Sequence, residues 1–359
     1  MIGNQINLQL ANPGGRLYPV SVCLQMILGY KGEKYRVFEV ENISGHPYGW
    51  FYINQLISGT GREIEITPGT ELTSSMKIAA DNIGYKFVHC ETNVWQEMES
   101  FLRFELNNNN PIIFGPISYK HLVYQIGAHR ATEIASHYIV LVGYDNDNVY
   151  FHDPNGMSYV SFTFTKLRDA CTLAMKFLSN KRFSALVLKE KVSNFSNSEI
   201  FKKVVARAVN SYHDKKVRNG GFVGLICLKK YSQDIENWLG AETKLEKEMI
   251  MRKLGLFFYP KSNQMRADAI TYMQNFKKSN FNISNRIEEF CSLFTKACVL
   301  HCEAASMIIP NLVHFDENKM KSVIKFLKNN ALELYELESQ GYEKLKEINS
   351  IINGSEGGD

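Results

Sequence analysis

The chain has 359 residues, of which 45% are hydrophobic and 22% are charged. This composition is typical of globular proteins and excludes a wholly disordered chain. The formal net charge of +4 is too small to indicate a nucleic-acid-binding protein. The length predicts two domains, because single hydrophobic cores stop growing at about 250–300 residues.

Cysteine usage and hydropathy indicate a cellular compartment. No apolar run reaches the ~20 residues that span a bilayer, and the segment 1–10 lacks the basic-then-apolar pattern of a signal peptide. The seven cysteines are odd in number and form no CxxC pair, which fits a reducing compartment. We therefore expect a cytoplasmic protein that contacts neither membrane nor nucleic acid.

The first half of the chain predicts a mixture of helices and strands. Helices are expected at about 21–31, 74–84 and 94–107, with a Gly- and aromatic-rich loop at 45–50. Short β-branched or aromatic runs bounded by Asn, Asp, Gly or Pro indicate strands. These runs are 111–116, 137–144, 149–153, 158–163 and 183–189.

The second half has a different character. A polar linker at 193–198 precedes helical periodicity from 198 to 352, interrupted near 218–221, Pro260 and Pro310. The predicted fold class is therefore α+β: an α+β domain over 1–192 followed by an all-α helical domain over 193–353. The Gly-rich segment 354–359 is expected to be a disordered tail.

The first helix carries a candidate nucleophile, Cys23. With Ser21 as N-cap and Gly32 at the C′ position, Cys23 falls in the first helical turn. There the helix dipole and free backbone N–H groups favour a thiolate and lower the thiol pKa. The alternative is a small core residue, the commoner role of a lone buried cysteine.

A predicted hairpin carries a candidate base and its orienting group. His137 opens the first strand, and Asp153 closes the second after an Asp/Asn turn. If Tyr144 pairs with Asn148 across a three-residue loop, Asp153 lies opposite Ile139 and on the same face as His137. A four-residue loop would place the two side chains on opposite faces unless a β-bulge intervened.

Cys23, His137 and Asp153 supply the three chemistries of nucleophilic catalysis: a nucleophile, a base and a group that fixes the base's tautomer. His152 points to the opposite strand face from Asp153. The remaining candidate histidines, His46, His121 and His129, lie in predicted loops. The alternative reading is that His137 merely begins a strand.

A cysteine that opens an early helix, followed much later by HYIVLVGYDNDNVYFHDP, resembles the papain-like C39-type cysteine peptidases. The helical second half, with the run 266–273 and a long terminal helix, makes the whole chain similar to the butirosin-type acyltransferase group. It also resembles the papain-like amide-forming enzyme of closthioamide biosynthesis. The resemblance implies a papain-like domain followed by a helical domain, with Cys23 as nucleophile, His137 as base and Asp153 as orienter.

The same resemblance implies a reaction and its partners. Members of the acyltransferase group move an acyl group from a carrier-protein thioester to an amine in nonribosomal antibiotic assembly. We therefore expect a small amine acceptor such as a diamine or an aminosugar, and no cofactor of the chain's own, because the phosphopantetheine arm belongs to the carrier protein. C39-type peptidases usually have a Gln six residues before the cysteine, which donates to the oxyanion, and here that position is Leu17.

The missing donor bears on the reaction type. The oxyanion would need the backbone N–H of Cys23 and another donor, such as Tyr18 or an amide in 14–18. Losing one such donor typically costs ~10²–10³ in rate. A thioester is already activated and tolerates this loss better than a peptide bond, which favours acyl transfer. A C39-like cysteine peptidase or amidase, and a non-catalytic binding module, remain the alternatives.

Other residues are candidates for binding. The long connection at 116–136 abuts the predicted site and carries Tyr124 and Glu133, where Glu133 would hold a cationic amine; an ordinary surface connection is the alternative. Tyr48 and Trp50 either line an acyl channel or belong to the core.

The basic run 202–230 has eight Lys or Arg residues and one acid. It is either a solvated helix face or a docking patch for an acidic carrier protein through Lys202, Lys203 and Arg207. Cys291, Cys298 and Cys302 share one helical stripe, which predicts core packing and no metal site. No nucleotide-binding or HExxH motif occurs.

Overall fold

The computed structural model describes residues 6, 18–57, 61–69, 72–130, 136–172, 181–216, 221–241, 243–277, 281–312 and 316–354. The chain divides into two compact units. Unit 1 comprises residues 1–40 and 83–194, and unit 2 comprises residues 41–82 and 195–359. The fold class is α+β with a helical C-terminal part, as predicted.

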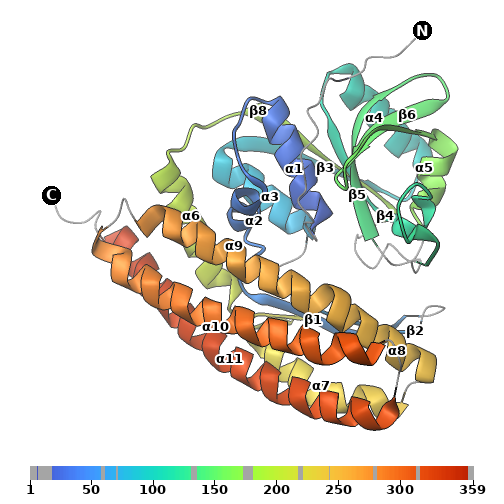
Figure 1. Ribbon diagram of the computed structural model, residues 1–359. Coiled ribbons are helices and arrows are strands. Elements are labelled where there is room, and N and C mark those ends of the chain that lie inside the picture. The colour runs from blue at the N-terminus through green and yellow to red at the C-terminus, as the bar shows by residue number, and fades with distance from the viewer. Residues whose placement is uncertain are drawn as a thin grey trace. The chain divides into compact units, whose positions relative to one another are not determined.

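Unit 1 is built on a six-stranded antiparallel sheet with the strand order β3-β8-β4-β5-β6-β7 (Figure 1). All seven residues of β4 are buried, and β5 is exposed only partly at its two ends. Continuous burial means that both faces of these central strands are covered, and helices α1 and α4 pack against them. The strands are β3 (Tyr85–Thr92), β4 (Ile112–Ser118), β5 (Ser136–Tyr144), β6 (Asn148–Asp153), β7 (Met157–Thr163) and β8 (Phe183–Lys191), and the helices are α1 (Pro19–Tyr30), α4 (Trp95–Asn107) and α5 (Phe164–Ala170).

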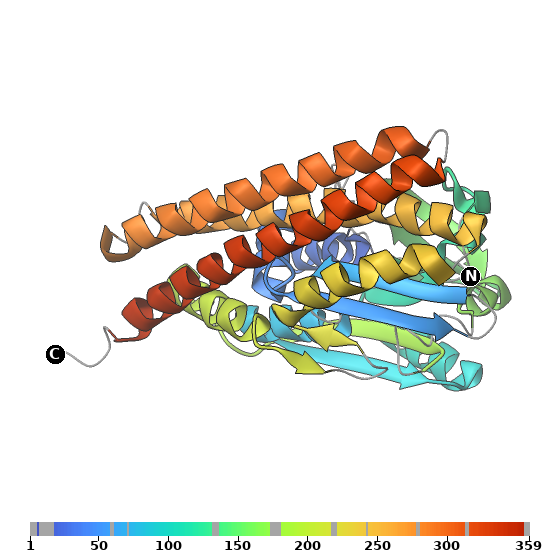
Figure 2. The ribbon, with the colours of Figure 1, turned by 90° about the horizontal axis from the view of Figure 1, so that it is seen from below.

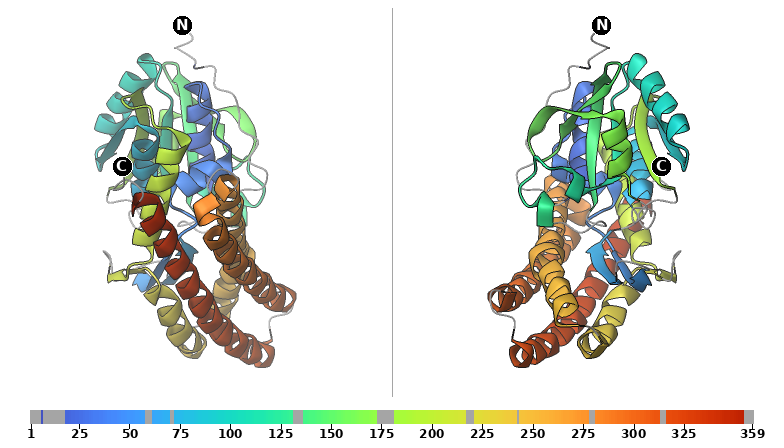
Figure 3. Two further views of the ribbon diagram at one scale, coloured as in Figure 1. Left: turned by 90° about the vertical axis from the view of Figure 1, so that its left-hand side faces the viewer. Right: turned by 90° about the vertical axis from the view of Figure 1, so that its right-hand side faces the viewer.

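Unit 2 is mainly helical, and its longest helices, α10 and α11, pack side by side (Figure 2). Helix α11 also packs on α7 and α6 (Figure 3). The helices are α6 (Asn197–Ser211), α7 (Ile226–Ala241), α8 (Lys244–Lys253), α9 (Tyr259–Lys277), α10 (Ser284–Ile308) and α11 (Glu317–Gly354); α2 (Val37–Ser44) and α3 (Leu72–Ile83) cross the division between the units.

Unit 2 also contains a small sheet that the sequence did not predict. Its strand order is β2-β1-β10-β9, with β1 (Trp50–Ile57), β2 (Gly61–Pro68), β9 (Lys215–Lys216) and β10 (Phe222–Val223). Phe51 pairs with Val223, so residues from before the predicted linker are hydrogen-bonded to residues after it. One division falls between Asn194 and Phe195, within the predicted linker. The residues before it do not form one unit, however, because 41–82 belong to unit 2.

The helix breaks predicted at proline do not all occur. Pro260 is the second residue of α9, and the turn before it, Leu254–Phe258 (η5), is a π-helix, so the chain stays helical through this region. Pro310 lies in the short 3-10 helix η7 (Ile309–Leu312) that extends α10. Because the chain is already helical before each proline, each one removes an intrahelical N–H donor, and at both sites the helix departs from α geometry, as a π turn before Pro260 and as a 3-10 turn around Pro310. Of the predicted tail, Gly354 ends α11 and 355–359 lie outside the described residues.

The cysteine stripe of α10 is only partly in the core. Cys291 is buried and its thiol points to the carbonyl of Ile270, whereas Cys302 is exposed. The prediction that all three cysteines pack in the core is therefore wrong for Cys302. Among the described residues, no group of three or more His, Cys, Asp or Glu side chains is arranged to hold a metal ion.

One helical stretch among the described residues, Ser284–Leu312, is long and apolar enough to cross a membrane by length and composition, with a mean hydropathy of 1.3. This differs from the expectation that no segment would qualify. A third of the apolar window is buried, and Phe290 and Phe294 lie in the unit 2 interior. The core helix of a globular protein meets the same criterion.

Candidate active site

A β-bulge brings His137 and Asp153 to the same face of the hairpin. Tyr144 pairs with Val149, and not with Asn148 as the three-residue loop requires. The pairing then shifts by one residue between Leu141 and Gly143, so that Val140 faces His152. The bulge at Val142 thus restores the register that a four-residue loop would otherwise lose.

His137 and Asp153 form a buried hydrogen-bonded pair. The Nε2 atom of His137 lies 3.1 Å from both carboxylate oxygens of Asp153. The His137 residue is 3% exposed and Asp153 is fully buried. With Nε2 donating to Asp153, the basic lone pair of the neutral imidazole is on Nδ1.

Two further donors stabilise the Asp153 carboxylate. The backbone N–H of Asn155 donates to Oδ1 at 2.7 Å, and the hydroxyl of Tyr124 donates to Oδ2 at 2.7 Å. Burial raises the pKa of Asp153, but the hydrogen bonds and the charge of His137 outweigh burial and lower it below its usual value. A carboxylate with several donors stays ionised in the interior.

Cys23 lies on α1, which packs against β5, the strand that carries His137. Its side chain is fully buried. Burial, together with the negative charge of Asp153, raises the pKa of the Cys23 thiol well above its usual value. The thiol is therefore neutral in the resting structure, and the predicted lowering of its pKa is wrong.

The helix dipole does not lower the pKa of Cys23, because α1 begins earlier than predicted. Pro19, not the residue after Ser21, is the first helical residue, and Tyr18 is the N-cap. Cys23 is then the fifth residue, in the second turn, where the dipole effect has decayed. Its N–H belongs to the i→i−4 ladder with Pro19 as acceptor, so it is not a free oxyanion donor. At the other end, Gly32 takes a φ of +85°, as predicted for the C′ position.

The segment 119–127 lies against the His137–Asp153 pair. The ring of Tyr119 meets the ring of His137 edge-on, with centroids 5.5 Å apart. Tyr124 was predicted to bind substrate, whereas the structure bonds its hydroxyl to Asp153. Periodicity and motif spacing gave no signal for this contact, because the segment has no regular secondary structure beyond the short 3-10 helix η1 (Tyr119–His121).

Gly115 allows β4 to approach β5 closely beside His137. Its φ is +149°, and a Cβ atom there would lie 2.7 Å from the carbonyl oxygen of His137 and 2.7 Å from the ring of Tyr138. No real Cβ makes contacts this short. Only glycine fits this position without a shift of the backbone that holds His137.

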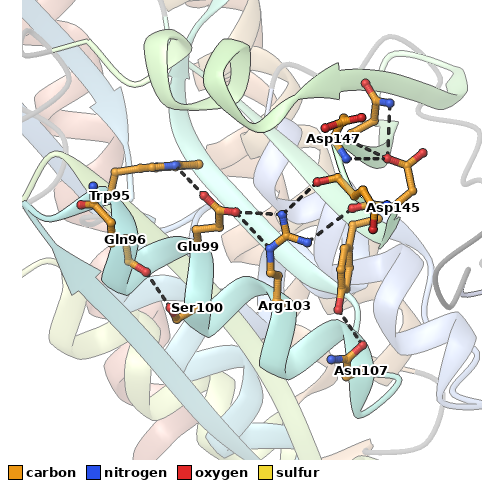
Figure 4. Close-up of polar contacts among 11 residues, drawn as sticks. Trp95, Gln96, Glu99, Ser100, Arg103, Asn107, Asp145 and Asp147 are labelled. Atoms are coloured by element: carbon orange, nitrogen blue, oxygen red, sulfur yellow. Dashed lines mark hydrogen bonds and ion pairs between the residues drawn. The ribbon is translucent and has the colours of Figure 1, made fainter. Parts of the chain in front are cut away.

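The tip of the same hairpin is fixed to α4 (Figure 4). Arg103 donates to Glu99 at 2.8 Å and to the backbone oxygens of Asp145 and Asn146 at 3.4 Å. Asp145 in turn accepts from the backbone N–H groups of Asp147 and Asn148. This network holds the conformation of the loop at the tip of the hairpin.

The remaining predicted binding residues have other positions. Tyr48 and Trp50 are fully buried in unit 2, where Trp50 packs on Phe258, so they are core residues as in the second of the two readings. Tyr18 is buried at the N-cap of α1. Glu133 lies outside the described residues.

The predicted docking residues on α6 are only partly exposed. The ammonium group of Lys203 lies 3.0 Å from the ring centroid of Phe195. Arg207 is half-buried, and a Cβ atom placed on Gly45 would lie 3.4 Å from its Cγ. Lys202 is likewise of intermediate exposure. These side chains have local contacts, so they do not form a purely solvated face.

A cysteine on a helix packed against a strand, with a buried His–Asp pair on that strand and its neighbour, is the arrangement expected in a cysteine-peptidase-like fold. In agreement, residues 21–171, which hold all three side chains, match the Peptidase_C39 like family. This match covers less than half of the chain.

Two individual proteins are also similar. The uncharacterized protein YobF of Bacillus subtilis (strain 168) is 22% identical over 194 residues, which cover 51% of this chain and 62% of YobF. A crystal structure of a putative C39-like peptidase from Bacillus anthracis aligns with a TM-score of 0.36 and 14% identity, covering 54% of this chain and all of that one.

Proposed function

We propose that this protein is a cysteine acyltransferase that forms an amide bond by way of a Cys23 acyl-enzyme. The buried hydrogen bond between His137 and Asp153, on the strand that packs against the helix of Cys23, is the observation that supports it most. A base held by a carboxylate is needed to activate a thiol that is neutral at rest. A cysteine that only packed in the core would not need a base and a carboxylate on the neighbouring strands.

The reaction has two balanced steps. In the first, the Cys23 sulfur attacks the carbonyl of an acyl thioester, His137 takes the thiol proton, and the proton passes to the departing thiol of the donor. In the second, an amine attacks the Cys23 thioester, His137 accepts the proton that the nitrogen loses, and the proton returns to the Cys23 sulfur. The Asp153 carboxylate stabilises the imidazolium formed in both steps.

The donor is proposed to be a thioester because the site is weakly equipped for amide cleavage. The pKa of the thiol is raised by burial, and the N–H of Cys23 is engaged in its helix. Leu17 stands where C39-type peptidases usually carry an oxyanion-stabilising Gln. A thioester carbonyl is more reactive than an amide and needs less stabilisation of its oxyanion. A carrier protein would present this donor, with Lys202, Lys203 and Arg207 as its proposed contacts.

A C39-like cysteine peptidase is the second candidate, favoured by the match of residues 21–171 to that family. It would use the same three residues, with water in place of the amine. Transfer and hydrolysis are therefore distinguished by the fate of the acyl-enzyme, and not by its formation.

Intact-protein mass spectrometry after mixing with an acyl-pantetheine thioester tests the proposal. Wild type is expected to gain one acyl mass, and Cys23→Ala none. Cys171→Ala is the matched control, because Cys171 is a second buried cysteine of unit 1 and its loss should leave the adduct intact. Rapid clearance of the adduct by a diamine or aminosugar, but not by water, supports transfer.

Two other outcomes of this experiment would contradict the proposed acyl transfer. Equal clearance by water and by amine, with cleavage of peptide substrates, would establish the peptidase. An adduct that persists in Cys23→Ala would exclude Cys23 as the nucleophile.

A further inference from the structure

We infer that Tyr124 is a positioning residue for the His137–Asp153 pair, holding the Asp153 carboxylate ionised and aimed at His137. This role rests on the proposed function, because it assumes that the pair activates Cys23. It assigns Tyr124 to the catalytic apparatus, where the sequence indicated only a substrate contact.

The hydrogen-bond partners of Asp153 show why a third donor matters. His137 shares its N–H between the two oxygens, at 3.1 Å from each, so it alone does not choose between them. Asn155 binds Oδ1 and Tyr124 binds Oδ2, both at 2.7 Å. The two shorter bonds fix the carboxylate plane from opposite oxygens, and the imidazole then meets a carboxylate that cannot rotate.

Packing of the Tyr124 ring holds its hydroxyl in place. The ring packs on Phe151 and Phe162, with centroid distances of 6.2 Å and 6.3 Å. The backbone around it is closed by a hydrogen bond from Gln125 to Leu122 at 2.7 Å. Aromatic contacts on one end and a carboxylate on the other leave the side chain little freedom.

Four ionisable groups face Asp153 from the elements around it: Cys23 from α1, His137 from β5, and Tyr119 and Tyr124 from the segment 119–127. Of these four groups, only His137 becomes positively charged when it takes up a proton. Burial raises the pKa of Asp153, and the bond from Tyr124 is one of the interactions that lower it. Without Tyr124, the buried oxygen Oδ2 loses its shortest bond and the carboxylate takes up a proton more readily.

Substitution Tyr124→Phe tests this role, since it removes the hydroxyl and keeps the ring. A hydrogen bond to a charged group contributes about 1.5 kcal/mol, equivalent to about one pH unit. In protein labelled with ¹³C at the aspartate carboxyl carbons, the Asp153 signal, identified by its absence in Asp153→Asn, should titrate about one unit higher in Tyr124→Phe. The acid limb of the acyl-transfer rate should move in the same direction, because a carboxylate with one donor fewer binds the His137 imidazolium more strongly.

Tyr150→Phe is the matched control. Tyr150 donates an equally short bond, 2.6 Å, to Asp145 in the loop of the same hairpin. Its loss should leave both the Asp153 titration and the acid limb unchanged. Replacing Tyr124 by a more acidic fluorotyrosine keeps the hydroxyl and strengthens it as a donor, so both readouts should move in the opposite direction. This variant keeps the inference testable if Tyr124→Phe fails to fold.

Two results would overturn the inference: an unchanged Asp153 titration, or a lower plateau rate in Tyr124→Phe with the acid limb in place, which indicates a merely structural role. A failure of the proposed function is recognised separately. In that case wild type shows no acyl transfer with any donor, while the carboxyl titration still decides whether Tyr124 controls Asp153.

Discussion

Asp153 is the residue at which burial and hydrogen bonding oppose each other most directly. Its carboxylate is fully buried, yet three donors reach it from β5, from the segment 119–127 and from the turn after β6. At Cys23, equally buried, a backbone hydrogen bond offsets burial and the charge of Asp153 only in part, and the pKa of its thiol rises. The two groups therefore rest as an anion and a neutral thiol, and His137 must carry the proton when the thiol reacts.

Substitution Asp153→Asn is expected to lower the rate of acyl-enzyme formation by at least about 100-fold, because His137 loses the group that fixes its tautomer. It should also destabilise the protein above about pH 4. The pKa of Asp153 is lower folded than unfolded, so the carboxylate stabilises the fold above the unfolded value and loses this effect as the pH falls. Melting temperatures of wild type and variant should converge as the pH falls below about 4; a constant difference would contradict this account.

At this scale the sequence predicted that His137 and Asp153 could share one face of a hairpin, because strand alternation and turn composition are local. It could not predict the protonation state of Cys23. That depends on where α1 begins and on how deeply the sheet buries the thiol, and both are set by tertiary packing. The bond between Tyr124 and Asp153 was inaccessible for the same reason.

Among the elements, the close approach of strands β4 and β5 requires a residue without a side chain at position 115. Gly115 lies against the carbonyl of His137 at a φ of +149°. The prediction of strands at 111–116 and 137–144 was confirmed, but their close approach was not visible in the sequence. Hydropathy identifies a buried strand without showing which of its residues touches its neighbour.

Substitution Gly115→Ala is expected to destabilise unit 1 by at least about 2 kcal/mol, from backbone strain and a clash with the His137 carbonyl. It should also reduce the acyl-enzyme rate, because the strand that holds His137 must shift. Gly32→Ala is the control: Gly32 also has a positive φ, +85°, but open space around its Cβ direction. It should cost only about 1 kcal/mol. Equal unfolding free energies for the two variants would refute the role of close approach.

For the whole molecule, the main feature is that residues 1–194 are divided between the two units. Residues 41–82 belong with the helical C-terminal part. There Tyr52 donates to Asp234 at 2.7 Å, and the buried guanidinium of Arg266 lies 4.6 Å from the ring of Trp50. The change of composition near residue 193 lies beside one division, between Asn194 and Phe195. The other divisions left no such mark, because a strand pairing between distant segments has no local signature.

A fragment of residues 1–194 is therefore expected to fail as an independent domain. It would expose Tyr48, Trp50 and Tyr52, which are buried in unit 2. Size-exclusion chromatography and dye binding should show aggregation or exposed apolar surface, and co-expression of residues 195–359 should restore solubility. A soluble, cooperatively unfolding 1–194 monomer would show that the two units are separable at this point.

The bulge at Val142 has a consequence for how this hairpin tolerates change. The loop is one residue longer than the register allows, and the bulge removes the excess. What keeps His137 and Asp153 on one face is the pairing of Val140 with His152, and not the number of loop residues. A shorter loop, or a strand that lacks Val142, can keep this pairing, whereas a strand that takes Val142 into a regular ladder moves Asp153 opposite Val140 and turns the two side chains to opposite faces. The hairpin can therefore accept insertions and deletions in its loop more readily than a change that straightens the strand at Val142.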